Sequence, residues 1–394
     1  MESTQVVTSQ PMRVLLLYRT FGPSVNLCAM LQLKQLAQTG NIALRHVRIL
    51  AAKKADLEWA QLIIFVRGDG LLDEWMAKVC HQAGKKILYI LDDDLLNVPM
   101  SLGSGPYYAQ QSVKDHIEKM MEYSDYFASP SDVLIEKYGP RFSYSFRIIE
   151  PSAYVMRKKE KNPTGTVRIG FAGSADRGSD IDAILAEALR QITKKYGDRV
   201  SIEIFGTETK IAKEIPCRQY KYTESYQEYQ EKMHALNWDI GLAPMPDTPF
   251  HRCKHYNKLV EYCGFGIAGI YSNVKPYAGE VEDGVTGLLC ENTTQAWVSA
   301  ITRLIEDQAL REKISETCLL RAQTVYSVPS AAESFLQNLE ALSLSDVPYT
   351  KIGFLGWAKL CGLISWYREK FQKFGWKTPL IAVKKMIKII AGDV

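Results

Sequence analysis

Two lysines and a glutamate, Lys254, Lys258 and Glu261, stand at a spacing that places side chains on one face of a helix. They fall in the segment KHYNKLVEYCGFG, which we expect to be helical from residue 254 until its glycines end it. A helix start carries partial positive charge, so lysines there are favourable only beside an anion. We expect the lysines to bind a diphosphate and Glu261 to bind a ribose hydroxyl. The alternative is a solvated helix face with a Lys–Glu pair, worth roughly 0.2–0.5 kcal/mol.

A turn made of small residues offers a second place for an anion. The segment FAGSADRGSD, residues 171–180, joins an expected strand to an expected helix and contains Gly173, Ser174 and Arg177. Its free backbone N–H groups could approach a phosphate closely, with the guanidinium of Arg177 nearby. An ordinary turn between a strand and a helix explains the same residues equally well.

Three consecutive aspartates, Asp92 to Asp94, directly follow the apolar run KKILYIL. Carboxylates in this pattern could hold Mg²⁺ or Mn²⁺ on a sugar diphosphate, or could cap a turn and the helix after it. His251 and His255 flank Lys254 but have no third ligand at a sensible spacing. We expect no metal site and favour the other roles for the aspartates.

The elements that position these residues alternate between strands and helices. Buried-type strands are expected at residues 13–18, 62–66 and 85–91, and the alternation restarts at TVRIGFAGS. The charged stretch MRKKEKNPTG between these two series suits a linker between domains. The pattern therefore predicts an α/β protein with two Rossmann-like lobes facing a cleft. We place the lobes at residues 1–155 and 156–342, followed by a tail at residues 343–394.

The second half of the chain resembles glycosyltransferases with the GT-B fold, in particular the retaining group 1, or family-four, branch. The resemblance lies in an aspartate-led strand, a proline-bearing loop, lysines before a K-x-x-E-Y helix, a glycine-led strand and a G-x-x-G-L-L turn. These motifs correspond here to Asp239, Pro249, Lys254, Lys258 with Glu261 and Tyr262, Gly266 to Ser272, and Asp283 to Leu289. The likeness covers residues 13 to about 342, weakly in the first half and strongly in the second.

The resemblance implies transfer of a sugar from a nucleotide diphosphate sugar, with retention and without a metal or other cofactor. It implies catalytic roles for Lys254, Lys258 and Glu261. The implied donor-binding residues are Gly173, Ser174, Arg177, Asp247, Tyr277 and Glu280, and the implied acceptor-cleft residues are Asp92, Asp94 and His116. A surface position for His116 is the alternative. In such proteins the last helices cross back to the first lobe, and we expect the same here.

One position departs from the family pattern. Many members have a glutamate eight residues before the one that matches Glu261, whereas this chain has Cys253 there. Lys254, Lys258 or Asp247 could take over its contact with the donor sugar. The departure leaves open a non-catalytic partner protein in a glycan assembly complex. A metal-dependent transferase that uses Asp92 and Asp94 is the other alternative.

Composition and charge limit the rest of the interpretation. The 394 residues are 46% hydrophobic and 23% charged, which is typical of a folded protein with two domains. The eight cysteines lack C-x-x-C spacing and suit reduced thiols, and the first residues do not spell a secretory signal. We expect a cytoplasmic protein with a glycan, lipid-linked or protein acceptor and no nucleic-acid partner.

The tail is strongly basic. Residues 351–394 contain nine lysines and arginines against two acidic residues, and the segment TPLIAVKKMIKIIA has an apolar face opposite its lysines. A basic amphipathic helix with tryptophans is typical of a segment that lies on an anionic membrane surface. The alternative is that the tail packs against the first lobe.

Overall fold

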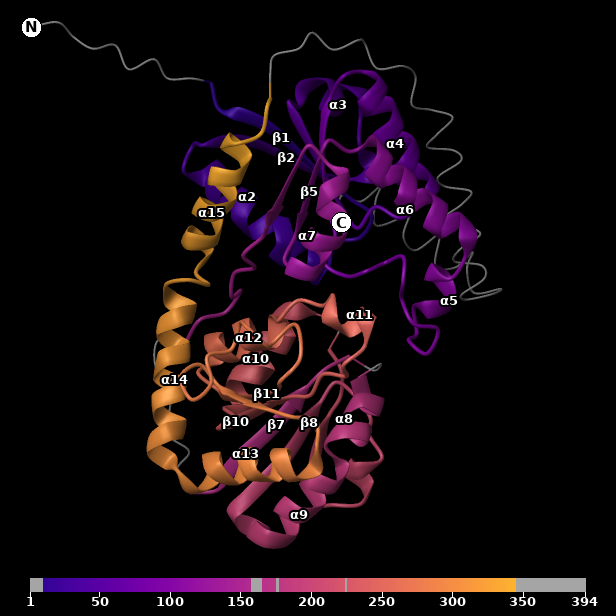
Figure 1. The fold of residues 1–394 in the computed structure, drawn as a ribbon. Helices are drawn as coiled ribbons and strands as arrows, with labels where there is room; N and C mark the ends of the chain where they lie inside the picture. The colour runs from indigo at the N-terminus through magenta and orange to yellow at the C-terminus, as the bar shows by residue number, and fades with distance from the viewer. Residues whose placement is uncertain (1–9, 157–164, 175–176, 224, 345–394) are drawn as a thin grey trace, which may run out of the picture.

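The computed structural model describes residues 10–156, 165–174, 177–223 and 225–344. These residues form two α/β lobes, one above the other in Figure 1, each built around a sheet of six parallel strands. The basic segment expected at residues 351–394 lies outside the described residues. The two lobes have the architecture that the alternating sequence pattern predicts.

The sheet of the first lobe has the order β2-β1-β3-β4-β5-β6. All its pairings are parallel, and Val14 of β1 lies opposite Leu44 of β2 on one side and Leu62 of β3 on the other. The central strands are continuous apolar runs because helices cover both faces of the sheet. The strands are β1 (Met12–Tyr18), β2 (Ile42–Arg48), β3 (Leu62–Val66), β4 (Lys86–Ile90), β5 (Tyr126–Ser129) and β6 (Tyr144–Arg147).

The sheet of the second lobe has the order β12-β11-β10-β7-β8-β9, again with every pairing parallel. Its core contains Trp238 and Trp297, whose side chains are fully buried. The strands are β7 (Val167–Ala172), β8 (Val200–Phe205), β9 (Cys217–Tyr220), β10 (Ile240–Ala243), β11 (Ala268–Ser272) and β12 (Leu288–Cys290). In both lobes, the loops that carry the candidate site residues follow the carboxyl ends of the strands. Ligands bind at this edge in open α/β sheets.

Helices connect the strands and cover the sheets. The first lobe has α1 (Pro23–Val25), the π-helical turn Asn26–Met30, α2 (Leu31–Gln38), α3 (Lys54–Trp59), α4 (Leu71–Gln82), α5 (Gly105–Tyr108), α6 (Gln111–Tyr123) and α7 (Asp132–Tyr138). The second has α8 (Gly178–Ile184), α9 (Ala186–Tyr196), α10 (Tyr226–Leu236), α11 (Pro249–Arg252), α12 (Asn257–Phe265), α13 (Thr294–Glu306) and α14 (Gln308–Gln323). The last described helix is α15 (Val328–Glu340).

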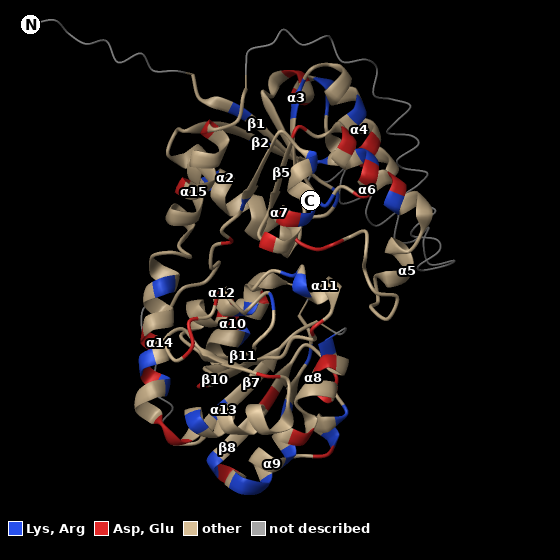
Figure 2. Cartoon of the chain, viewed as in Figure 1, with Lys and Arg blue, Asp and Glu red and all other residues tan. Residues whose placement is uncertain are grey.

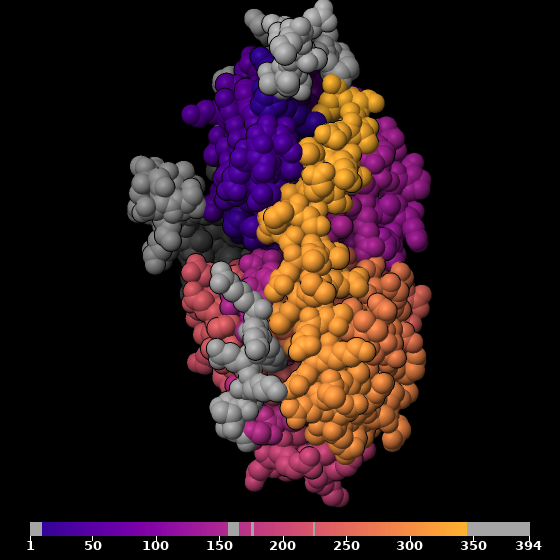
Figure 3. Space-filling view, turned by 90° about the vertical axis from the view of Figure 1, so that its left-hand side faces the viewer, coloured from indigo at the N-terminus to yellow at the C-terminus, as the bar shows by residue number. Residues whose placement is uncertain are grey.

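Helix α15 belongs to the first lobe in space, although it follows the second lobe in sequence. The C-terminal helices run along one side of both lobes in Figure 3, and α15 lies beside α2 in Figure 1. Phe335 packs edge-on against Phe146 of β6, with ring centroids 5.6 Å apart, and joins a core cluster of the first lobe. The Tyr144 hydroxyl also donates to Asn338 of α15 at 2.9 Å. The last described helix therefore crosses back to the first lobe, as expected from the sequence.

Two expected helices differ in the structure. The helix expected after the turn at residues 171–180 is interrupted in the structure, where α8 ends at Ile184 and α9 begins at Ala186. The helix expected from Lys254 begins only at Asn257, because α11 forms a separate turn before it. Lys254 therefore lies in a loop and not on the same helix face as Lys258.

In the part of the chain that the structure describes, no helix is both long and apolar enough to cross a membrane. The seven described cysteines are all free, and six of them are buried. Both findings apply only to the described residues between 10 and 344.

The packing of α15 predicts that a residue late in the sequence stabilises the first lobe. Phe335→Ala removes a ring that is 2% exposed and is expected to lower the free energy of unfolding by about 3–5 kcal/mol. Hydrogen exchange should then speed up in β1 and α2 more than in β7 and β8. Leu320→Ala on α14 is the matched control, because Leu320 is 60% exposed and its loss should change stability little. Faster exchange confined to β7 and β8 would contradict this assignment of α15.

Candidate functional site

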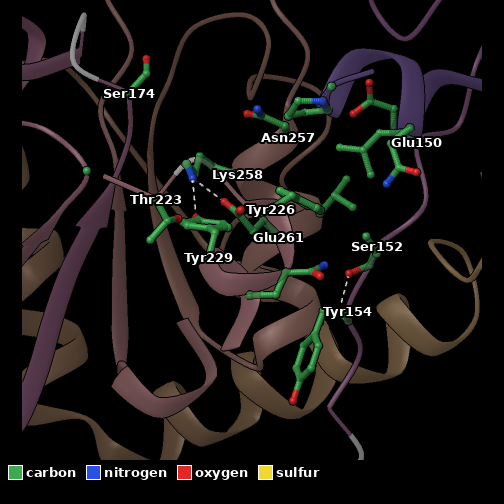
Figure 4. Close-up of a pocket in the computed structure, with 18 of the residues that line it drawn as sticks. Glu150, Ser152, Tyr154, Ser174, Thr223, Tyr226, Tyr229, Asn257, Lys258 and Glu261 are labelled. Carbon is green, nitrogen blue, oxygen red and sulfur yellow. Dashed lines mark hydrogen bonds and ion pairs between the residues drawn. The ribbon is translucent and has the colours of Figure 1, made fainter. Parts of the chain in front are cut away.

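A cavity of about 400 Å³ lies between the lobes, at the carboxyl edge of the second sheet. The first lobe contributes the loop after β1, and the second contributes the ends of β7 and β8, the start of α10 and one face of α12. Figure 4 shows the polar side chains that point into it. Its lining includes Phe21, Asn26, Glu150, Ser152, Tyr154, Gly173, Ser174, Phe205, Gly206, Tyr222, Thr223, Tyr226, Tyr229, Gln230, Asn257, Lys258, Val260, Glu261 and Phe265.

Helix α12 brings Lys258 and Glu261 to this cavity. Their side chains form an ion pair, and the Lys258 ammonium also donates to the Tyr229 hydroxyl at 3.3 Å. Leu259 on the other face is fully buried in the core of the second lobe. Among the described residues no side chain caps the start of α12, so its first N–H groups are free to meet an anion. Lys258, Glu261 and the start of α12 therefore lie together, as expected from the sequence.

A glycine lets α12 approach the segment that joins the two lobes. A Cβ on Gly264 would lie 2.2 Å from both the Ser152 hydroxyl oxygen and the Tyr154 carbonyl oxygen. Next to this contact, the ring of Tyr154 stacks on Phe265 with centroids 4.8 Å apart. The inter-lobe segment therefore forms a wall of the cavity directly against α12.

The loop between α11 and α12 is held by carboxylates on the other side of the cleft. Three consecutive side chains, at residues 253–255, each face one of these carboxylates. The pairs are Cys253 Sγ with Asp94 at 3.9 Å, Lys254 Nζ with Asp93 at 3.1 Å, and His255 Nδ1 with Glu150 at 2.8 Å. Figure 2 shows acidic residues of the first lobe opposite basic residues near α11.

Arg67 organises the aspartates on the first-lobe side. Its guanidinium contacts Asp92 at 3.0 Å and Asp93 at 2.9 Å, and its φ of 52° is a left-handed conformation that is uncommon outside glycine. Burial by itself raises the pKa of Asp93, but Lys254 and Arg67 together hold that pKa below its ordinary value. Asp93 is thus a partly exposed carboxylate shared by two cations from opposite lobes.

The remaining aspartate of the run has different partners. Asp94 accepts hydrogen bonds from Lys137 and from the Tyr138 hydroxyl, both at 2.6 Å, and is 2% exposed. Asp92 and Asp93 therefore share Arg67, whereas Asp94 faces Lys137 and Tyr138. No group of three His, Cys, Asp or Glu residues suited to a metal occurs in the described ranges.

The glycine turn after β7 reaches the same cavity. Gly173 and Ser174 line it, beside Gly206 at the end of β8. Arg177 turns away from the turn, pairing with Asp180 at 3.1 Å and donating to the Pro244 carbonyl at 2.8 Å. The turn therefore lines the cavity with Gly173 and Ser174, whereas Arg177 is not among the lining residues.

The lowered pKa of His251 reflects positive charges near α11 as well as burial. Its Nδ1 lies 2.7 Å from the Thr248 hydroxyl, and its side chain is mostly buried. Burial first, and then the charges of Arg177 and Lys254, lower the pKa of His251 to about 4. Burial and two nearby cations therefore both favour the neutral form of this ring.

Several expected site residues lie outside the cavity lining. Asp247 is exposed and forms two hydrogen bonds with Arg252, at 2.6 and 2.9 Å. Tyr277 is 1% exposed in the core of the second lobe. Glu280 pairs with Arg147 of β6 at 2.6 Å, and both line a smaller space beside Lys254. Glu280 therefore helps to join the lobes.

His116 is on α6, where its Nδ1 lies 2.6 Å from Glu74 of α4. It is not among the residues that line the cavity. This placement matches the surface alternative given for it in the sequence analysis.

Several lining residues were not predicted from the sequence. Tyr226 and Tyr229 begin α10, and their spacing of three residues was a visible signal that both rings face one side. Glu150 stands before a proline where the chain leaves the first lobe, which was also visible. Thr223 gave no signal, because a single threonine in a loop has no recognisable pattern.

The second lobe matches a known family. Residues 258–318, which begin at the Lys258 of α12, match the model of the glycosyl transferases group 1 family. No curated protein gives a significant match to the chain.

Solved structures share the whole two-lobed fold. Anabaena HepE, in complex with UDP and glucose, is 13% identical with a TM-score of 0.60, covering 84% of this chain and 100% of that one. A glycosyltransferase from Rickettsia africae is 13% identical with a TM-score of 0.59, covering 86% and 100%. A UDP-GlcNAc 2-epimerase from Neisseria meningitidis, bound to UDP-GlcNAc, is 12% identical with a TM-score of 0.52, covering 84% and 100%.

These structural similarities establish the fold. Because a transferase and an epimerase both have this fold, the fold alone does not decide the reaction. The family match falls on the helix that carries the lysine and the glutamate of the cavity. The chain is therefore a glycosyltransferase with the GT-B fold, and it resembles the group 1 family.

Proposed function

We propose that this protein transfers a sugar from a uridine diphosphate sugar to a glycan, lipid-linked or protein acceptor, with retention of configuration and without a metal. One observation carries the proposal. Lys258, Glu261 and the uncapped start of α12 meet at one inter-lobe cavity, within the segment that matches group 1 transferases. The neighbours HepE and the Neisseria epimerase were solved with UDP or a UDP-sugar, which supports uridine as the donor base.

The ion pair of Lys258 and Glu261 suggests how the donor binds. A diphosphate at the start of α12 offers Lys258 a stronger partner than a single carboxylate, since it carries more charge and also meets the helix end. Glu261 is then released to accept hydrogen bonds from the ribose hydroxyls. The pair thus keeps both side chains in place before the donor arrives.

Charge develops on the leaving group during the reaction. The bond between the anomeric carbon and the β-phosphate oxygen breaks, and the carbon passes through an oxocarbenium-like state. Lys258 and Lys254, with the helix start, stabilise the negative charge on the departing diphosphate. The acceptor oxygen attacks on the same face of the sugar, and its proton goes to the departing phosphate oxygen. No protein base is needed for this step.

The structure bears on the alternative of a non-catalytic partner. That alternative rests on Cys253, which replaces a glutamate found in many group 1 members. Here Cys253 is 3% exposed and faces Asp94, so a glutamate at this position would place a second carboxylate against a buried one. The departure follows from the contact with the first lobe and does not remove Lys258 or Glu261 from the cavity.

We further propose that the acceptor enters from the first-lobe side and that the protein acts in the cytoplasm, with an anionic membrane surface as the partner of residues 351–394. This part rests on the sequence of the tail, which lies outside the described residues. Sedimentation with anionic and with neutral vesicles tests it. Equal binding to both, or to neither, would argue against a charge-driven membrane contact.

Replacing Lys258 tests the donor site. Lys258→Ala removes a charge-assisted contact and is expected to weaken UDP binding by about 10- to 100-fold. Isothermal titration calorimetry measures this directly. Lys232→Ala is the matched control, because Lys232 is an exposed lysine on α10 that pairs with Glu228. Equal UDP affinity in the wild type and Lys258→Ala would refute the proposed diphosphate position.

The pKa of His251 reports independently on where the diphosphate lies. Its value of about 4 in the free protein reflects burial and the charges of Arg177 and Lys254. A bound diphosphate adds negative charge there, so the pKa of His251 should rise towards the ordinary value of about 6.5. NMR titration with and without UDP measures the change, and His251→Gln assigns the signal. An unchanged pKa in saturating UDP would place the diphosphate elsewhere.

Metal removal separates the proposal from the metal-dependent alternative. Because Asp92 and Asp93 are paired with Arg67, we expect EDTA to leave UDP affinity and UDP-sugar turnover unchanged within about twofold. Turnover can be followed as UDP release from a panel of UDP-sugars. Loss of activity in EDTA that Mg²⁺ or Mn²⁺ restores would instead support the alternative that uses Asp92 and Asp94.

A further inference from the structure

One ion pair joins the two lobes through a lysine that the proposed function assigns to the donor diphosphate. The ammonium of Lys254 lies 3.1 Å from a carboxylate oxygen of Asp93, and both side chains are 23% exposed. Lys254 belongs to the loop between α11 and α12, whereas Asp93 follows β4 of the first lobe. A negative charge beside an ammonium opposes the approach of a second anion to it. The pair therefore affects how strongly the second lobe can bind a diphosphate.

The charge of Lys254 also acts on the second-lobe side of the cleft. Its ammonium lies over the ring of Phe250 on α11, 4.7 Å from the ring centroid. Burial raises the pKa of Asp180, and the charges of Arg177 and Lys254 oppose this rise. Asp180 belongs to α8, which follows the turn that lines the cavity. Because a lysine has a flexible four-carbon stem, its ammonium can exchange Asp93 for an anion bound near that turn.

The first lobe gives Asp93 a second cation. The guanidinium of Arg67 lies 2.9 Å from Asp93 and 3.0 Å from Asp92, and it donates to the Ser24 hydroxyl at 3.1 Å. A buried charge that loses its partner is costly, but Asp93 keeps Arg67 when Lys254 moves away. The inter-lobe pair can therefore be broken at a lower cost in free energy than a pair with no second cation.

We propose that Asp93 restrains Lys254 and thereby lowers the affinity of the site for the donor diphosphate. The diphosphate displaces the Asp93 carboxylate from the Lys254 ammonium, and Arg67 keeps the displaced carboxylate paired. Donor binding thus breaks one of the contacts between the lobes. This inference rests on the proposed function, since it takes Lys254 as a diphosphate-binding residue. It assigns control of donor affinity to a first-lobe residue outside both the cavity lining and the segment that matches the family model.

The direction of the effect follows from the charges. Asp93 is negatively charged, and its charge and that of the diphosphate repel each other at the same ammonium. An asparagine in its place keeps an oxygen that can accept hydrogen bonds from Lys254 and Arg67, but it has no charge. Removing the charge of Asp93 should therefore strengthen diphosphate binding. If Asp93 instead held Lys254 in place for the diphosphate, the same change would weaken binding.

A double-mutant cycle tests this role. UDP is titrated by calorimetry into the wild type, Asp93→Asn, Lys254→Met and the double variant. Asp93→Asn should bind UDP about three- to tenfold more tightly than the wild type. In the Lys254→Met background the same change should alter UDP affinity by less than about twofold, because no ammonium remains to be released. Asp93→Ser, a second neutral replacement, should change UDP affinity in the same direction as Asp93→Asn.

Asp132→Asn is the matched control. Asp132 is a first-lobe carboxylate that pairs with Arg147 at 3.1 Å and lines the same small space as Lys254. Its replacement removes the same charge from this side of the cleft without releasing Lys254. UDP affinity should therefore stay within about twofold of the wild type.

The other results would each overturn the inference. Unchanged or weaker UDP binding in both Asp93→Asn and Asp93→Ser would show that Asp93 does not restrain Lys254, while leaving the donor site intact. An equal gain in the Lys254→Met background, or in Asp132→Asn, would reduce the effect to a general change in charge. No UDP binding by the wild type or by any Asp93 variant would reject the proposed function together with this inference.

Discussion

The contact between the α11–α12 loop and three carboxylates is the interaction on which the site depends. A buried charge left unpaired costs several kcal/mol, and Asp94 and Glu150 are both buried. Residues 253–255 each contact one of the three carboxylates from the opposite lobe, in addition to the partners that the first lobe supplies to Asp93 and Asp94. The start of α12 follows two residues later, so the same contacts fix the position of Lys258 and Glu261 relative to the first lobe.

The cations of the candidate site are paired with carboxylates. Lys258 pairs with Glu261, and Lys254 pairs with Asp93 across the cleft. In the proposed function, a diphosphate would exchange one anionic partner for another, and the gain in free energy would be the difference between the two pairings. The start of α12, which no side chain caps in the described chain, would favour the diphosphate in this exchange.

The same contacts bear on position 253, where this chain departs from the pattern of many group 1 transferases. Asp94 already occupies the space in front of Cys253 and is bound by Lys137 and Tyr138. A thiol can lie against this carboxylate, whereas a second carboxylate would repel it in a buried setting. In the proposed function, contacts with the sugar would come from other residues of the cavity, of which Glu150 and Asn257 are polar and face it.

The sequence by itself determined the local elements and the residues that they carry. Apolar runs such as Leu62–Val66 predicted the buried strands, and the helical spacing of Lys258 and Glu261 placed them on one face, since periodicity is a local property. Only the tertiary structure decided that Lys254 lies in a loop facing Asp93, and that Thr223 has a buried, unpaired hydroxyl. Both depend on which distant segments meet at the cleft, and side-chain spacing along the chain does not encode such contacts.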